Sequence, residues 1–270
     1  MKVFVLGAGK VGRALAAALK KKGDRVVLRP ARKGVPRAKI DAQIVILAVR
    51  DRELGPLAEE LARSGVVPRS AVVVHNAGAL SADVLAPLRA VTQGVAQMHP
   101  MISFASKSFV PSLARGQCHV KGDPEAEKRA RALAKKLGMT PRTFAKLDTV
   151  GYHAAAGLVA NGAAALAAVG EELLVASGVP RKDASKMLGP LLRSVAENVE
   201  ALGFPDALTG PVRRGDAAGI QRQVNLLRER LPAAIPLFVA AAKAQLPLAR
   251  AIGDAPEASF DAVDDVLATL

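Results

Sequence analysis

The sequence is poor in cysteine and in aromatic residues. Among 270 residues it contains one cysteine, Cys118, no tryptophan, one tyrosine and seven phenylalanines. A single cysteine excludes an intrachain disulfide framework, and a chain of this length can bury a core without one. The lone thiol favours a reducing, cytoplasmic location. So few aromatic side chains also argue against a base-stacking platform for single-stranded nucleic acid.

Long, strongly hydrophobic runs are also missing. The start, MKVFVLGAGKVG, lacks the basic segment, the long apolar segment and the cleavage site of a signal peptide. A long uncharged span, residues 152–170, consists mainly of Ala and Gly and includes an Asn and a His. Such a segment gains too little in lipid to insert alone. We therefore expect no membrane span and interpret residues 152–170 as a buried helix of a soluble protein.

The net charge of +14 is unevenly distributed along the chain. Residues 1–149 contain 27 basic and 11 acidic residues, whereas residues 150–270 contain 11 basic and 13 acidic residues. A positive surface can track phosphates without aromatic residues, so a nucleic-acid binder that uses the first half is an alternative. Charge asymmetry alone is weak support, and we do not expect nucleic acid as the primary ligand.

Up to about residue 144, short β-branched runs alternate with charged helical patterns. Six runs have the composition of strands: KVFVL, RVVLR, IVILAV, AVVVH, GVAQM and CHVKG. The central runs are apolar throughout, as expected when helices cover both faces of a parallel sheet. In the last helical pattern, Asp123 can cap the helix, Pro124 can occupy its first position and Gly138 can end it. The alternation predicts an α/β fold of the Rossmann type, with a doubly wound, mostly parallel sheet.

After Lys146 the strand signals stop. Helical patterns follow at about 150–176, from near Pro180 to 202, in 219–231 and in 234–245. Gly- and Pro-containing breaks separate them. We therefore predict two domains, a nucleotide-binding Rossmann domain (1–148) and an all-α domain for substrate binding and dimerisation (149–270).

The first predicted strand leads directly into Gly7-Ala8-Gly9-Lys10-Val11-Gly12, and an Ala-rich helix follows. In a dinucleotide site the first glycine permits the tight turn, and the second lets the backbone approach the pyrophosphate. The third lets the helix pack closely on the strand, and the helix N-terminus offers free N–H groups to the anion. The motif therefore predicts a bound dinucleotide, with an empty, degenerate fold as the alternative.

The second predicted strand and the loop after it read RVVLRPARKG, a segment without Asp or Glu. An NAD site would place Asp or Glu there for the ribose 2′-hydroxyl, whereas Arg29, Arg32 and Lys33 supply positive charge where a 2′-phosphate would lie. We therefore predict NADP(H) rather than NAD(H), against the alternative of a solvated basic loop. The third strand ends in Ala48-Val49-Arg50, which we expect near the ribose and pyrophosphate. Asp51, which follows, could equally be only a helix cap.

Two predicted strands end in histidine-containing turns. AVVVH delivers His75 and Asn76, and GVAQM delivers His99 and Pro100, to the same edge of the sheet. Polar groups gathered where a nicotinamide should lie are candidates for substrate binding and proton transfer. Histidine titrates near neutrality and could give a proton to oxygen or nitrogen as hydride reaches carbon. We predict His99 as the proton donor and His75 with Asn76 as orienting groups; hydrogen-bonded structural histidines are the alternative.

The helical half offers further candidates, and none of them suggests a metal site. Tyr152 and His153 open its first helix, in reach of the predicted cleft. Asn161 stands alone among apolar residues there, and burying its amide unpaired would cost about 1–3 kcal/mol, so we expect a substrate, a cofactor carboxamide or a helix carbonyl as its partner. In TGPVRRGD, Arg213 or Arg214 could hold a substrate carboxylate, with an exposed salt bridge as the alternative.

The small residues of the same Ala-rich helix would allow it to approach a copy of itself closely. Closed, two-fold symmetric pairs are the commonest oligomers of soluble proteins. We therefore expect a homodimer that forms through the helical domain.

The segments GAGKVG, AVRDREL, HNAGALSADVLAPL, HPMISF, YHAAAGLVAN and ALTGPVRRGD span nearly the whole chain. Together they resemble a bacterial family of Rossmann-like oxidoreductases with a helical C-terminal domain of uncharacterised function. Distant relatives are pyrroline-5-carboxylate reductase, ketopantoate reductase, prephenate dehydrogenase and the β-hydroxyacid dehydrogenases. The resemblance implies a C-terminal domain similar to that of 6-phosphogluconate dehydrogenase.

The resemblance also implies roles for single residues. In prephenate dehydrogenases a similar His-Pro motif supplies a histidine that hydrogen-bonds the hydroxyl being oxidised, and by resemblance this role falls on His99. The β-hydroxyacid dehydrogenases and ketopantoate reductases use a lysine and an asparagine one helical turn apart, but the residue four before Asn161 is Gly157. If the role of Asn161 is carried over, the acid must be His99, His153 or water.

From these features we predict an NADP(H)-dependent oxidoreductase that reduces a C=O or C=N bond. Its substrate would be a small, carboxylated molecule bound between the two domains. The alternative is a non-catalytic NADP(H)-binding or sensing protein, which the missing lysine favours.

Overall fold

The computed structural model describes residues 1–269. The chain divides into two compact units, residues 1–160 and the residues from Asn161 onward. The predicted domain boundary coincides with the start of helix α4 (Thr149–Ala176), whereas the boundary between the units falls inside that helix. The first turns of α4 therefore belong to the first unit.

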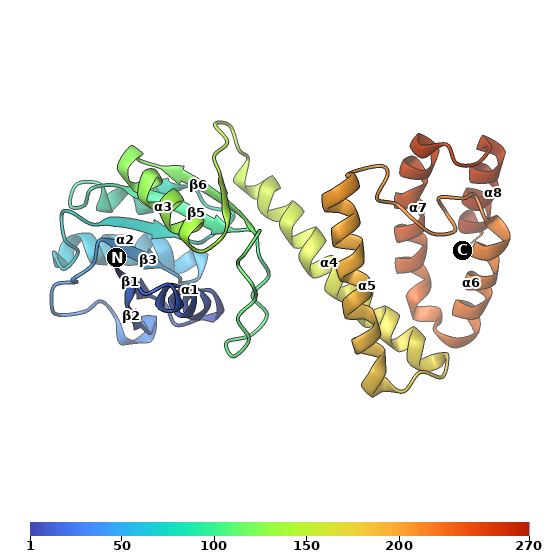
Figure 1. Ribbon diagram of the computed structural model, residues 1–270, viewed down its shortest axis with the longest axis horizontal. Coiled ribbons are helices and arrows are strands. Elements are labelled where there is room, and N and C mark those ends of the chain that lie inside the picture. Colours follow the sequence, from blue (N-terminus) through green and yellow to red (C-terminus); the bar gives the residue numbers. More distant parts are fainter. Residues whose placement is uncertain (270) are drawn as a thin grey trace. The chain divides into compact units, whose positions relative to one another are not determined.

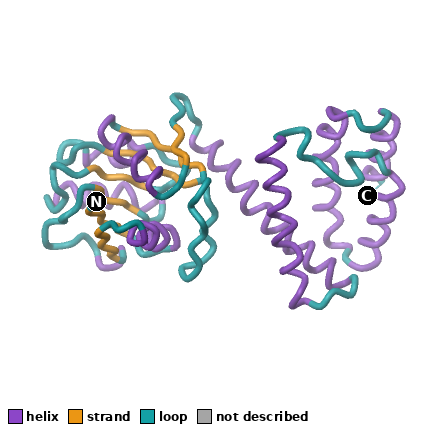
Figure 2. Tube along the Cα trace, viewed as in Figure 1, coloured by secondary structure: helices purple, strands orange, loops and turns teal. Residues whose placement is uncertain are grey.

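Residues 1–160 form a seven-stranded sheet with the order β2-β1-β3-β4-β5-β6-β7 (Figure 1). Its strands are β1 (Lys2–Leu6), β2 (Arg25–Arg29), β3 (Ile44–Leu47), β4 (Val72–His75), β5 (Val95–Pro100), β6 (Gln117–Gly122) and β7 (Thr140–Arg142). The first five pair in parallel, β6 runs antiparallel to β5, and β7 runs parallel to β6. Figure 2 shows the strands in orange and the helices in purple. The predicted doubly wound, mostly parallel sheet is confirmed. β7, a short edge strand that contains Pro141, was not predicted.

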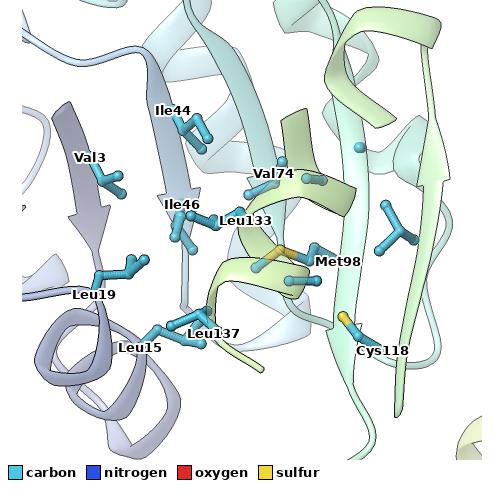
Figure 3. Packing of buried hydrophobic residues seen from close by; sticks show 14 of the residues in the cluster. Val3, Leu15, Leu19, Ile44, Ile46, Val74, Met98, Cys118, Leu133 and Leu137 are labelled. Atoms are coloured by element: carbon cyan, nitrogen blue, oxygen red, sulfur yellow. The ribbon is translucent and has the colours of Figure 1, made fainter. Parts of the chain in front are cut away.

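Helices cover both faces of the sheet because successive side chains of each strand point to opposite faces. Val3 of β1 packs in one layer with Leu15 of α1 (Lys10–Lys21) and Leu133 of α3 (Pro124–Lys136) (Figure 3). The next residue, Phe4, belongs to the opposite layer, with α2 (Asp51–Ser64) and the 3₁₀ helix η2 (Ala82–Leu88). The sole cysteine, Cys118, is buried in the first layer, and burial raises the pKa of its thiol to about 12.

The predicted ends of α3 are confirmed in position but not in mechanism. Asp123 is the N-cap, Pro124 is the first helical residue, and Gly138 beyond the C-terminus has a φ of 87°. The Asp123 carboxylate makes no capping bond to the helix. It accepts the Val95 N–H at 2.9 Å and pairs with Arg89 at 3.1 Å. Asp123 therefore anchors the start of β5 to the segment after η2.

From Asn161 onward the described chain is helical, as predicted. After α4 come α5 (Arg181–Leu202), α6 (Ala217–Arg230), α7 (Ile235–Ile252) and α8 (Glu257–Ala268). Helices α6, α7 and α8 share a core that includes Val224, Leu246 and Phe260. α8 was not predicted, although its buried residues Phe260, Val263 and Leu267 have helical spacing.

Helix α4 differs from the expectation of a buried helix. None of residues 149–176 is buried within the described chain. The expectation was wrong because no other element of residues 1–269 covers this helix along its length. By length and composition alone, residues 149–176 and 232–252 could each cross a membrane, a test that core helices of soluble proteins also pass.

Candidate functional site

The glycine-rich turn lies between β1 and β3, where the strand order changes direction. In open parallel sheets, ligands bind at this point, outside the carboxyl ends of the strands. A Cβ atom on Gly7 would overlap the carbonyl oxygen of Ala48, and a Cβ atom on Gly12 would overlap that of Gly7. A Cβ atom on Gly9 would meet no atom within 4 Å. Packing therefore requires the first and third glycines, while the second borders open space that a ligand can enter.

Helix α1 begins directly after this turn. Gly9 is its N-cap, and its first turn contains no acidic residue. Within the described part of the chain, the main-chain N–H groups of Lys10, Val11 and Gly12 have no hydrogen-bond partner. Free N–H groups and the helix dipole favour an anion at such a position. The turn, completed by the half-buried Ala8, can therefore hold a pyrophosphate.

The basic loop after β2 is organised by one of its own arginines. Arg29 donates through Nε to the main-chain oxygen of Gly34 at 2.8 Å and through Nη2 to that of Lys33 at 2.6 Å. The side chains of Arg32 and Lys33, in the 3₁₀ helix η1 (Ala31–Lys33), are exposed. Arg29 thus shapes the loop, and Arg32 and Lys33 offer the charge to which a phosphate can bind.

The end of β3 borders the glycine turn, with Ala48 and Val49 half-buried and the Arg50 side chain exposed. Arg50 is the N-cap of α2, and its main-chain N–H donates to the Glu53 carboxylate at 3.2 Å. Asp51 is the first residue of the helix rather than its cap, because Arg50 and Glu53 already make the capping interaction.

His75 is fully buried and is bonded to main-chain atoms on both sides of its ring. The Ala77 N–H donates to Nδ1 at 3.2 Å, so the proton of the neutral ring lies on Nε2, which donates to the Ser81 carbonyl at 3.1 Å. Burial lowers the pKa of His75 to about 4, although the bond to Ser81 opposes this. Neither nitrogen is left for a substrate, which matches the structural alternative rather than an orienting role.

Asn76 makes one side-chain hydrogen bond and leaves one buried oxygen unpaired. Its Nδ2 donates to the Met98 carbonyl at 2.6 Å, which sets the orientation of the amide. Its Oδ1 is buried and has no partner among residues 1–269. The unpaired buried oxygen costs stability, and it is closed to a bound molecule in this structure.

His99 lies at the end of β5, against the first turns of α4. The Tyr152 hydroxyl is 3.2 Å from Nδ1 of His99, and the ring of His153 meets that of His99 edge-on at 5.8 Å between centroids. Burial raises the pKa of Tyr152 to about 12, so its hydroxyl keeps its proton. Burial, and secondarily the neighbouring histidines, lower the pKa of His99 to about 4. His99 is therefore neutral at pH 7.

The bond to Tyr152 is compatible with both neutral forms of His99. The Tyr152 hydroxyl can donate to Nδ1 of His99, which places the ring proton on Nε2, or accept from Nδ1–H, which leaves Nε2 as an acceptor. Nε2 faces Gly78, where an added Cβ would lie 2.8 Å away and would also overlap Nδ1 of His153. Residues 1–269 include no group of three metal-ligating side chains.

Gln97 and His119, which lie near His99, were not predicted as site residues. Both are buried. Gln97 Nε2 donates to the carbonyls of Ala77 at 2.8 Å and Gly78 at 3.2 Å, and Nδ1 of His119 lies 3.1 Å from Gln97 Oε1. β6 pairs His119 with His99 across the antiparallel ladder. The alternation in QCHVKG indicates a polar face on this strand, but it does not reveal the neighbouring strand.

The predicted residues of the helical half lie in the second unit, except Tyr152 and His153. Asn161 is exposed, so its amide needs no partner within the chain, contrary to the expectation. Arg213 pairs with Asp254 at 2.6 Å and donates to the Leu208 carbonyl at 2.8 Å, as in the structural alternative. Arg214 is exposed and lines a hollow of about 440 Å³ together with Arg222.

Comparison with known proteins gives two domain matches. Residues 117–245 match the domain of unknown function DUF2520, and residues 30–100 match the Rossmann-like domain. No curated protein matches the sequence.

Solved structures resemble the chain over nearly its whole length. A Bacteroides fragilis protein described as an NADP oxidoreductase has 22% identity and a TM-score of 0.70, with 91% of this chain and 98% of that chain covered. The Plasmodium falciparum pyrroline carboxylate reductase with NADP bound has 14% identity and a TM-score of 0.62, with 97% and 98% covered. An imine reductase from Streptomyces aurantiacus has 17% identity and a TM-score of 0.56, with 99% of each chain covered. These matches confirm the predicted resemblance, to Rossmann-like proteins with a helical C-terminal region.

Proposed function

We propose that this protein is an NADP(H)-dependent oxidoreductase that reduces a C=O or C=N bond of a small substrate. The main support is that one sheet edge carries both an open glycine turn at Gly9 and a histidine, His99, that is bonded to Tyr152 through Nδ1 alone among the described residues. The names of the similar solved structures, an NADP oxidoreductase, a pyrroline carboxylate reductase and an imine reductase, agree with it.

The residues of the chain fit NADP(H). The free N–H groups at the start of α1 would bind the pyrophosphate, and Arg32 and Lys33 would bind the 2′-phosphate. When bound, the nicotinamide supplies the hydride.

The state of His99 favours C=N over C=O. The expectation that this imidazole titrates near neutrality is not met, because its pKa is lowered to about 4. A neutral imidazole can form a hydrogen bond through Nε2 but is a weak acid. A ketone needs a proton as hydride arrives, whereas a protonated imine already carries one. A neutral imidazole also does not repel a cationic imine, whereas a charged imidazole would.

Binding of the carboxylate would fall to Arg214, because Arg213 is committed to Asp254. Arg214 and Arg222 line the same hollow, and two guanidinium groups are well suited to a carboxylate.

NADPH oxidation tests the proposal, with cyclic imines and oxo acids as substrates. We expect tighter binding of NADPH than of NADH and faster oxidation with imines. His99→Ala should lower turnover about 100-fold, as the loss of a hydrogen-bonding group at the reacting centre does, while NADPH affinity is nearly unchanged. If His99→Ala lowered turnover and NADPH affinity equally, His99 would be a structural residue. Tight NADPH binding without turnover of any substrate would favour the non-catalytic sensor.

The proposal includes a homodimer formed through the helical unit, in the cytoplasm. On α5, Met187, Leu191 and Val195 follow one another at four-residue intervals and are 54%, 57% and 48% exposed. Neighbouring apolar side chains exposed to this degree mark interaction surfaces, and a second copy would cover them.

A further inference from the structure

The hydrogen bonds around Gln97 can run in only one direction. The carbonyl oxygens of Ala77 and Gly78 only accept, so the group of Gln97 that faces them is its NH₂. Oε1 of Gln97 then faces Nδ1 of His119 at 3.1 Å, and an amide oxygen only accepts. His119 must therefore carry a proton on Nδ1.

His119 carries no second proton at neutral pH. Burial, and secondarily Lys121, lower its pKa below the usual value. Its Nε2 is buried and finds no partner within residues 1–269, as expected for a nitrogen without a proton in a site without a donor. His119 is thus a neutral ring whose one N–H is committed to Gln97.

The chain of hydrogen bonds ends at the wall of the candidate site. Gly78 lies so close to Nε2 of His99 and Nδ1 of His153 that no side chain fits between them. A shift of the main chain at residues 77–78 by a few tenths of an ångström would change the surroundings of His99. Gln97 holds the carbonyls of both residues in that segment.

We propose that His119 is a positioning residue that acts through Gln97 to hold the main chain of Ala77 and Gly78 against the imidazole of His99. The proposal rests on the proposed function in naming His99 as the group that faces the reacting atoms. The hydrogen-bond chain itself can be tested without turnover.

The first test is the position of the protons on the imidazoles. The protein has four histidines, so ¹⁵N-histidine labelling gives a small set of long-range ¹H–¹⁵N signals that single substitutions assign. At pH 7.5 we expect His119 as the Nδ1–H form. A proton on Nε2 instead would overturn the proposal.

The second test separates the hydrogen bond from packing. The amide nitrogen of Asn can occupy the place of Nδ1, whereas Leu fills more of the volume but donates nothing. His119→Leu should shift the imidazole signals of His99 and lower turnover about 10-fold with NADPH affinity unchanged, and His119→Asn should restore both toward the wild type. A packing role predicts the reverse order, because Asn leaves the larger void. Melting temperature and NADPH affinity show whether each variant is folded.

A double-mutant cycle identifies the route of the effect. Once Gln97→Leu has removed the link, His119→Leu should cause no further change in the His99 signals. Additive changes would mean that His119 acts on His99 by another path. If the wild type turns over no substrate, the reductase proposal fails while the proton position and the cycle still decide the role of His119.

Discussion

At the scale of single residues, two histidines at neighbouring strand ends have different surroundings. The turn after β4 brings the Ala77 N–H and the Ser81 carbonyl back to the ring of His75, so main-chain atoms use both of its nitrogens. His99 is bonded only through Nδ1, to Tyr152, and its Nε2 remains beside Gly78. The same residue type therefore serves the fold at one strand end and can serve a ligand at the next.

Acid should destabilise the protein through His75. Its pKa falls from 6.5 to about 4 on folding, so the unfolded chain binds the proton first as the pH drops. This contribution to stability is present above pH 6.5 and is lost toward pH 4. The loss amounts to about 2 kcal/mol at pH 5. Urea unfolding at pH 7.5 and pH 5 measures it. His75→Gln, which does not titrate, should depend less on pH, and equal dependence would contradict the assignment.

Removing the Tyr152 hydroxyl should disturb His99 without unfolding the protein. In Tyr152→Phe, the bond that favours one neutral form of His99 is lost, so the ring should populate both neutral forms. A neutral hydrogen bond contributes about 0.5–1.5 kcal/mol, so turnover should fall about 2- to 10-fold with NADPH affinity unchanged. Histidine ¹⁵N spectra and NADPH oxidation report both effects. An unchanged His99 signal would show that Tyr152 does not favour one form.

At the scale of elements, the β1 turn and α1 show how one motif combines packing with binding. Gly7 and Gly12 are required by neighbouring main-chain oxygens, whereas Gly9 faces open space. Local spacing alone predicts this arrangement, because strand, turn and helix are consecutive in the chain.

Substituting two of these glycines should separate folding from binding. Gly9→Ala has room and an ordinary backbone conformation, with φ −74°, so stability should change by less than about 0.5 kcal/mol. Its Cβ would occupy the space left for a phosphate, so NADPH affinity should fall at least 10-fold. Gly12→Ala should instead lower the melting temperature, because its Cβ overlaps the Gly7 carbonyl. Unchanged NADPH affinity in Gly9→Ala would remove the turn from the binding site.

The sequence predicted the elements and sites that depend on neighbouring residues, but not those that depend on contacts between distant parts of the chain. Strand composition and the order of strands and helices predicted the sheet, and the strand-end rule predicted where His99 lies. The position of His119 was not predicted, because an antiparallel neighbour for β5 depends on the long connection between them. The burial of α4 was predicted wrongly, because an apolar composition shows that a helix needs cover but not that its own chain provides it.

At the scale of the whole molecule, the expected oligomer depends on the exposed apolar residues of α5, Met187, Leu191 and Val195. Leu191→Asp would place a charge in the proposed interface, so sedimentation should detect monomers where the wild type forms dimers. Arg193→Asp, two residues along on another face of the helix, is the matched control and should stay dimeric. A monomeric wild type at micromolar concentration would contradict the proposed homodimer.

The burial of Cys118 has a practical consequence for spectroscopy. A thiol that stays protonated inside the core reacts slowly with maleimides and other alkylating reagents. A cysteine introduced on the surface would therefore carry the only reactive sulfur, and an introduced tryptophan would be the only indole in the chain. Fluorophores and spin labels can be attached at chosen positions in an otherwise native background.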